Sequence, residues 1–240
     1  MREDLQAFLG RAHALRAASS SSTASLPALC SLEELRAQRE EDPTQLTFEA
    51  LRGRLIEVSA SGASAVLTAA IGWVLQAQLA AEPVVWVTLR ESSFYPPDVV
   101  ECGVDIEAIV VIRVGDVHNA GKVAERLLRS TAFGLVILDL GTPEWVIERN
   151  TLLGAPNRGH SLARYGRLVA LAKKSETLVV CITNKNDDME SMSSLVSLRA
   201  DAFREQDRTG LSVALRVLKD KRRGPGWIQR QRARGPAGLI

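Results

Sequence analysis

The segment IEVSASGASAVLTAAI, residues 56 to 71, decides how the middle of this chain folds. It begins as an apolar strand, passes through small residues and continues into a run that suits a helix. A strand, a small-residue turn and a helix in this order form the layout of a phosphate-binding loop. Such a loop needs glycines, so that backbone amides can surround the phosphates, and a lysine for positive charge. This segment has one glycine and no lysine.

The composition is that of an ordinary globular protein. The chain has 240 residues, of which 46% are hydrophobic and 24% are charged, so it is long enough for one sizeable domain with appendages. No apolar run is long enough to cross a bilayer, and the N-terminus carries acids where a signal peptide has an apolar core. We therefore expect a cytoplasmic protein without membrane contact. Three separated cysteines and three histidines without ligand spacing predict neither disulfides nor a metal site.

Outward from residue 56, short apolar segments alternate with helical ones as far as residue 218. Strands that alternate with helices indicate a mostly parallel sheet with helices on both faces. The last two strands are joined by a turn-rich segment, which predicts an antiparallel hairpin at the C-terminal edge. The fold class is therefore α/β. We expect strands at residues 54–59, 84–89, 109–114, 134–139, 177–183, 195–203 and 211–218, and helices at 64–81, 116–130 and 161–175.

Two flanking segments differ in composition from this core of residues 51–218. Residues 1–50 combine an amphipathic helical pattern with a serine-rich linker, and form a helical appendage that suits either docking to a partner or packing on its own domain. Residues 219–240 contain seven basic residues and one acid, so this segment carries a net charge of +6 and the remaining chain −4. Its Gly-Pro-Gly sequence at residues 224–226 excludes a helix, and we expect a flexible, extended basic tail.

Polar residues follow several of the expected strands. Glu91, Asp139 and Asn184 each stand at or just after the carboxyl end of a strand, as does the loop after Val58. In open α/β sheets, ligands bind at this edge. The same residues also have ordinary structural interpretations, because an acid or amide that ends a buried strand often forms a solvated turn.

Taken together, the core segments resemble the RecA-type recombinase core. Residues 56–58 resemble the strand that leads into the RecA phosphate loop, and ECGVDI at 101–106 resembles the leucine-glycine-valine-aspartate turn of that family. LLRSTAFGLVILD at 127–139 is similar to the helix and strand that deliver the Walker B aspartate. LVALAKKSETLVVCITN at 168–184 is similar to the helix and strand before the second DNA-contacting loop. The resemblance covers residues 51–218 and implies a RecA-like fold.

The resemblance also implies roles for individual residues. Glu91 takes the place of the water-activating glutamate, Asp139 that of the Walker B carboxylate, and Asn184 that of a nucleotide-sensing glutamine. The lysine of the phosphate loop falls on an apolar residue, which cannot supply the charge-assisted hydrogen bonds that a triphosphate needs. We therefore expect no ATP or magnesium cofactor and no enzymatic activity; the alternative is a DNA-dependent ATPase with a non-standard loop. The degenerate nucleotide-binding positions are Gly62, Ser64, Val66 and Thr68.

Overall size, the shortened core, the degenerate phosphate loop and the basic tail resemble the ImuA family in particular. Members of that family are RecA-like accessory proteins of the SOS translesion mutasome. The resemblance implies a nucleoid-associated adaptor that binds the inactive Y-family polymerase ImuB, with an error-prone replicative-type polymerase and RecA as further candidate partners. Cell-division inhibitors of the SulA type share the shortened RecA-like fold and form the other alternative.

Two basic segments are candidates for contact with a partner protein or with DNA. One is the tail, in which arginine and lysine can neutralise phosphates and a tryptophan can stack on a base or fill a pocket of a partner. The other is the segment 141–159, which matches the first DNA-contacting loop of recombinases. A solvated tail and an ordinary connecting loop are the corresponding structural interpretations. The candidate residues are Arg149, Arg158, Lys221, Arg222, Arg223, Trp227, Arg230, Arg232 and Arg234.

Overall fold

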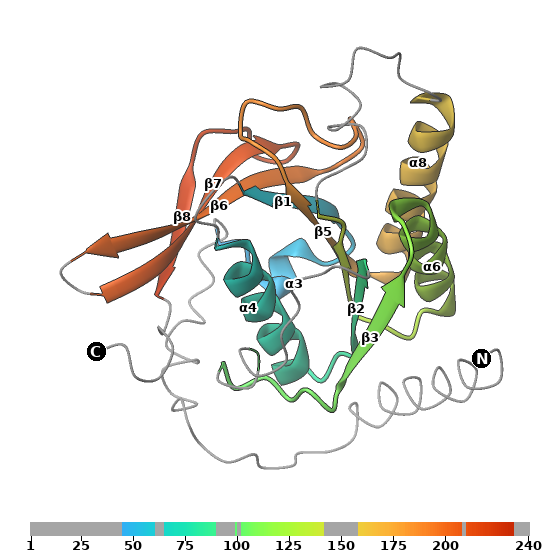
Figure 1. The fold of residues 1–240 in the computed structure, drawn as a ribbon, viewed down its shortest axis with the longest axis horizontal. Coiled ribbons are helices and arrows are strands. Elements are labelled where there is room, and N and C mark those ends of the chain that lie inside the picture. Colours follow the sequence, from blue (N-terminus) through green and yellow to red (C-terminus); the bar gives the residue numbers. More distant parts are fainter. Residues whose placement is uncertain are drawn as a thin grey trace.

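The computed structural model describes residues 45–60, 65–89, 99, 102–141, 158–207 and 210–232. These residues form one eight-stranded sheet with helices on both faces (Figure 1). The strand order is β3-β2-β4-β5-β1-β6-β7-β8. In chain order the elements are α3 (Phe48–Leu51), β1 (Leu55–Ala60), α4 (Val66–Leu79), β2 (Val84–Leu89), β3 (Ile109–Val114), α6 (Val117–Ser130), β4 (Leu135–Asp139), α8 (Arg158–Ser175), β5 (Leu178–Asn184), β6 (Leu198–Asp207), β7 (Gly210–Asp220) and β8 (Ile228–Arg232).

Strand directions divide the sheet into two parts. From β3 to β6, every neighbouring pair is parallel, including β1 with β5 and β1 with β6. Strands β7 and β8 then continue the sheet in antiparallel pairing. The predicted α/β fold, its mostly parallel sheet and its antiparallel C-terminal edge are therefore confirmed.

Two apolar clusters hold the helices onto the sheet, one on each face. Alternation along β2 shows the division, because Val84 and Trp86 pack in the cluster with α4, whereas Val85 and Val87 pack in the cluster with α6 and α8. Figure 1 shows α4 on one side of the sheet and α6 with α8 on the other. Successive side chains of a strand point to opposite faces, so a sheet covered on both faces needs continuously apolar strands. The run VVWVTL in β2 meets that need.

Local capping fixes the start of α6. The Asp116 carboxylate accepts a hydrogen bond of 2.7 Å from the Asn119 amide, as an N-cap residue does. The helix ends at Thr131, which adopts a left-handed conformation with φ 55°. None of the helices in the described part of the chain is long and apolar enough to span a membrane.

The segment after Leu218 is part of the sheet as far as residue 232, and the prediction of a flexible tail is wrong for those residues. Strand β7 continues to Asp220, and β8 pairs with β7 through Arg216 and Ile228 at one end. The connecting turn uses Gly224 and Gly226, with φ 83° and 101°, conformations that glycine adopts without steric cost. The Gly-Pro-Gly sequence therefore marks a tight reversal between strands.

The other flank also joins the core where it is described. Phe48 and Leu51 of the short helix α3 are both 1% exposed and pack in the cluster with α4. The Trp73 indole of α4 donates a hydrogen bond of 2.7 Å to the carbonyl of Leu46. Residues 45–50 thus belong to the folded core, while the rest of the predicted N-terminal appendage lies outside the described residues.

Candidate functional site

The carboxyl ends of β4, β5 and β1 meet at one edge of the sheet, as the parallel order requires. Asp139 ends β4 opposite Ile182 of β5, and Asn184 ends β5 opposite Ala60 of β1. The structure therefore brings Asp139 and Asn184 to the edge where the small-residue loop leaves β1. Glu91, Gly62 and Ser64, which were predicted to share this site, lie outside the described residues.

Asp139 is packed into this edge and is only 8% exposed. The Thr88 hydroxyl on the neighbouring strand β2 donates a hydrogen bond of 3.2 Å to its carboxylate. Asn184 has an exposed side chain, and its backbone amide donates a bond of 2.7 Å to the Gly141 carbonyl. Of the two predicted polar residues, Asn184 is thus the one that faces solvent.

Helix α4 begins at the position where, in a phosphate-binding protein, the helix follows the phosphate loop. Its N-terminus is apolar and buried. Ala65, the N-cap residue, makes no side-chain capping bond, and its amide donates to the carbonyl of Ala202 on β6. Ala65 is 1% exposed and Val66 is 4% exposed, and the first turn of the helix has no acidic residue. Helix N-termini bind anions through amides that remain open to the ligand. Here the amide of the N-cap residue Ala65 is taken by β6, and Thr68 is half-buried.

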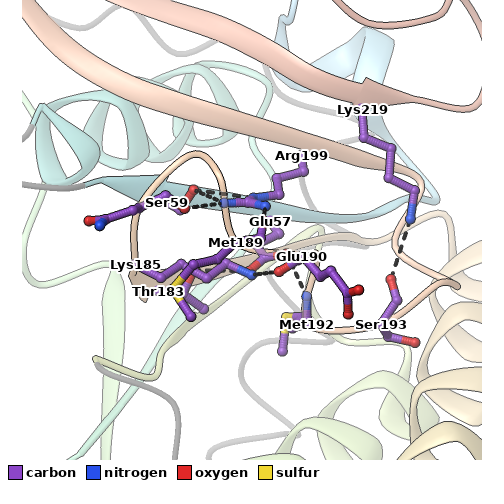
Figure 2. Close-up of polar contacts among 11 residues, drawn as sticks. Glu57, Ser59, Thr183, Lys185, Met189, Glu190, Met192, Ser193, Arg199 and Lys219 are labelled. Atoms are coloured by element: carbon purple, nitrogen blue, oxygen red, sulfur yellow. Dashed lines mark hydrogen bonds and ion pairs between the residues drawn. The ribbon is translucent and has the colours of Figure 1, made fainter. Parts of the chain in front are cut away.

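A cluster of buried charges is centred on Glu57 of β1 (Figure 2). It lies on the face of the sheet that α8 covers, the face to which Leu55, two residues earlier in β1, also points. Glu57 is fully buried, and one carboxylate oxygen forms an ion pair of 2.5 Å with the Lys185 ammonium. The same oxygen accepts a hydrogen bond of 3.0 Å from the Thr183 hydroxyl, and the other oxygen accepts one of 2.9 Å from the Met192 amide. A buried carboxylate is stable only when it is paired and hydrogen-bonded in this way.

The same cluster ties the segment 185–197 across the sheet. Arg199 of β6 is 3% exposed and donates to the Ser59 hydroxyl at 3.4 Å, to the Asn186 carbonyl at 2.7 Å and to the Met189 carbonyl. The Lys185 ammonium also donates to the Glu190 carbonyl at 2.5 Å. Figure 2 shows these contacts converging from β1, β5 and β6 onto one loop, which we call the clamped loop (residues 185–197).

Burial lowers the pKa of Lys185, and the nearby carboxylate of Glu57 opposes that shift. Burial likewise lowers the pKa of Arg199, again opposed first by Glu57. Lys185 follows β5 at the same edge as the small-residue loop, but its ammonium is engaged by Glu57 and by the Glu190 carbonyl. It therefore does not replace the lysine that the loop lacks.

Sequence reasoning missed this cluster, although one signal was present. Glu57 interrupts an otherwise apolar strand, and such an acid predicts either an exposed edge or a buried partner. The partner could not be identified, because Lys185 and Arg199 are more than 120 residues away in sequence. The clamped loop itself carries the exposed acids Asp187 and Asp188, of which Asp187 forms an ion pair of 3.1 Å with Arg216.

The predicted binding residues of the C-terminal segment are divided between a turn and a strand. Lys221, Arg222 and Arg223 are exposed in the turn between β7 and β8. Trp227 is half-buried against the α4 cluster, and the Arg223 guanidinium lies 5.8 Å from its ring centre. Arg230 of β8 forms an ion pair of 2.7 Å with Glu205.

The remaining basic candidates lie at the ends of elements or outside the described residues. Arg158 begins α8 and Arg232 ends β8, with side chains that are not described, while Arg149 and Arg234 lie outside the described residues.

Comparison with known proteins adds one finding to this geometry. No protein family and no curated protein matches the sequence. Among solved structures, a crystal structure of the RadB recombinase is similar over 78% of this chain and 93% of its own, with a TM-score of 0.56 and 17% sequence identity. This chain has a RecA-like fold. The predicted RecA-like core is thereby confirmed as a fold.

Proposed function

We propose that this chain is a non-enzymatic RecA-like adaptor of the ImuA type, acting in DNA-damage-induced translesion synthesis. Its main partner would be ImuB, with an error-prone replicative-type polymerase and RecA as further partners. The observation that carries the proposal is the apolar, covered N-terminus of α4, where Ala65 and Val66 are 1% and 4% exposed. A RecA-like core without a working phosphate site can still act by binding other macromolecules through its surfaces.

Loss of the nucleotide site follows from the charges available at that edge. A bound triphosphate must replace its hydration with dense charge-assisted hydrogen bonds. The loop has no lysine, and the Lys185 ammonium is engaged in the ion pair with Glu57. Phosphoryl transfer is catalysed almost entirely by positioning and by charge at the phosphates. Without that charge, Asp139 and its partner Thr88 serve to hold β4 beside β2.

An adaptor role is further supported by the rigidity of the clamped loop. Loops that bind partners gain affinity when they are ordered before binding, because less conformational entropy is lost on association. Here Glu57, Lys185 and Arg199 fix the loop through buried contacts, and the loop exposes two acids, Asp188 and Asp187, of which Asp187 also pairs with Arg216. A preformed acidic surface is suited to a basic patch on a protein partner.

Nucleotide binding tests the premise directly. We expect the melting temperature of the full chain to be unchanged by ATP with magnesium, since a ligand that does not bind the native state cannot stabilise it. A ligand at about 100 times its Kd would add about 2.7 kcal/mol of stability, which is easily measured. Saturable stabilisation by magnesium-ATP would contradict the adaptor proposal and favour a DNA-dependent ATPase.

Partner capture tests the positive part of the proposal. The tagged full chain should retain purified ImuB, and the double substitution Asp187→Ala with Asp188→Ala should weaken retention. The matched control is Lys122→Ala with Arg126→Ala, which changes two exposed charges on α6 and should leave retention unchanged. Failure of the unaltered chain to retain ImuB would remove the mutasome role, and equal weakening by both double variants would exclude the clamped loop as the contact.

A further inference from the structure

The turn between β7 and β8 is held in one conformation by backbone and side-chain bonds. The Lys221 amide donates to the Ser197 carbonyl at 2.9 Å, and the Gly224 amide donates to the Asp220 carbonyl at 3.0 Å. The Asp220 carboxylate accepts a further bond of 3.0 Å from the Arg222 amide. The three consecutive cations at residues 221–223, which we call the basic turn, are therefore displayed on a fixed backbone.

A buried ion pair supports the basic turn from below. The Arg54 guanidinium lies 2.7 Å from the Asp220 carboxylate, and their side chains are 6% and 2% exposed. This pair is neutral as a unit, so Asp220 does not cancel the charge of the turn. A hollow beside it is lined by Arg54, Asp220, Arg222 and Arg223, with Ala50 and Leu51 of α3.

The cations of the basic turn have no acidic partner among the described residues. Arg222 donates a weak bond of 3.4 Å to the Ala50 carbonyl, and Arg223 lies over the Trp227 ring. Neither of these contacts, nor any made by Lys221, involves a carboxylate in the described part of the chain. Like charges held together without counter-charges attract anions from solution.

The basic turn and the acids of the clamped loop lie toward opposite ends of the same strands. Asp220 pairs with Leu198, which pairs with Ile56 near the amino end of β1. Asp187 contacts Arg216, which lies across β6 from Ser59 near the carboxyl end of β1. A nucleic acid laid along the clamped loop would therefore meet carboxylates, whereas one laid at the amino end would meet cations that have no acidic partner within the described ranges.

We propose that the basic turn binds the phosphodiester backbone of nucleic acid at the amino-terminal edge of the sheet. Phosphate contacts need only positioned positive charge, and they supply most of the sequence-independent affinity for nucleic acids. Little apolar area lies beside this charge: Trp227 is half-buried on the core, with its indole donating to the Gly224 carbonyl at 3.2 Å, and the neighbouring Ile228 is 38% exposed. Protein interfaces depend on buried aromatic or aliphatic anchors, so an acidic peptide is a poorer fit.

The binding should therefore be independent of sequence and strongly dependent on salt. Each neutralised phosphate releases counterions, and the logarithm of affinity falls with the logarithm of salt by about 0.9 per contact for duplexes and about 0.7 for single strands. Duplexes and single strands present the same phosphodiester chemistry, so both should bind. For the same number of contacts, the salt dependence should be steeper for the duplex.

Fluorescence anisotropy with the purified full chain tests the proposal. The probes are a labelled oligothymidylate and a labelled mixed-sequence duplex, titrated between about 50 and 200 mM salt. We expect Arg222→Ala with Arg223→Ala to weaken binding about tenfold at the lowest salt and to reduce the slope by about two contacts. Lys122→Ala with Arg126→Ala on α6 removes the same charge from exposed positions and should leave the affinity nearly unchanged.

Three results would overturn the proposal. They are absence of salt-dependent binding by the unaltered chain, equal weakening by both double variants, and displacement of the oligonucleotide by polyglutamate as readily as by unlabelled oligonucleotide. The last result would indicate an acidic peptide as the natural ligand. This experiment contains neither ATP nor ImuB, so its outcome is separate from that of the adaptor proposal.

Discussion

Glu57 shows how one side chain can set the position of a whole loop. Its carboxylate is satisfied by Lys185, by Thr183 and by the Met192 amide, and two of these three partners belong to the clamped loop. Burying a charge is costly, but leaving one buried without its partner is much more costly. The loop conformation in which the charges pair is therefore strongly preferred.

Removing one member of the buried pair should destabilise the fold more than removing both. We expect Lys185→Met, which leaves Glu57 buried without its counter-charge, to lower the free energy of unfolding by about 3–5 kcal/mol in urea denaturation. The double variant with Glu57→Gln should lose less stability than Lys185→Met alone, because no unpaired buried charge remains. Asp188→Ala, which alters an exposed acid of the same loop, should change stability by less than about 0.5 kcal/mol. Strict additivity would show that the pair is not coupled.

The two described cysteines should differ sharply in reactivity. Cys102 is exposed, whereas Cys181 is fully buried in β5 and burial raises the pKa of its thiol. The thiolate is the reacting species, so burial and a raised pKa both protect Cys181. Iodoacetamide in mildly alkaline buffer should alkylate Cys102 in the native protein and Cys181 only after denaturation, as read by peptide mass spectrometry. Equal labelling in the native state would contradict the burial of β5.

Single elements were predictable wherever their own sequence decides the structure. The strands VVWVTL and LVILD are continuously apolar, and α6 begins at a capping aspartate, Asp116. Strand β8 was missed because IQRQR has no apolar alternation and reads as part of a solvated tail. What makes it a strand is the reversal at Gly226 and its pairing with β7, and such tertiary context overrides local propensity.

The reversal before β8 gives an element-level prediction. Gly226 has φ 101°, and its amide donates to the Val217 carbonyl at 2.8 Å. We expect Gly226→Ala to cost about 1–3 kcal/mol, because a Cβ is strained at this backbone angle. Gly115 has no such angle, and a Cβ added there has no atom within 4 Å, so Gly115→Ala should change stability by less than about 1 kcal/mol. Equal effects in urea denaturation would argue against the turn.

Across the whole molecule, the fold could be predicted from the sequence, but the distribution of charge on it could not. The parallel order follows from strands that alternate with helices, and it placed Asp139 and Asn184 at one edge as expected. The buried pairs of Glu57 with Lys185 and of Arg54 with Asp220 join residues that are far apart in the chain. No local sequence pattern predicts such pairs.

Truncation after Leu218 is therefore expected to damage the fold and not merely to remove a tail. It deletes β8, the packing of Trp227 and the partner of Arg54, whose side chain is 6% exposed. An uncompensated buried guanidinium alone costs about 3–5 kcal/mol, so the truncated chain should unfold at much lower urea than the full chain. Asp220→Asn should reproduce a large part of that loss.

Substitution of Arg222 and Arg223 by alanine provides the control, because their side chains are exposed and the turn is held by backbone bonds. The free energy of unfolding of that variant should differ from that of the unaltered chain by less than about 0.5 kcal/mol. Only side-chain variants of this kind can attribute binding to the basic turn, since truncation would confound lost contact with lost structure. If the truncated chain were as stable as the full chain, residues 219–232 would not be an integral part of the fold, and the prediction would be contradicted.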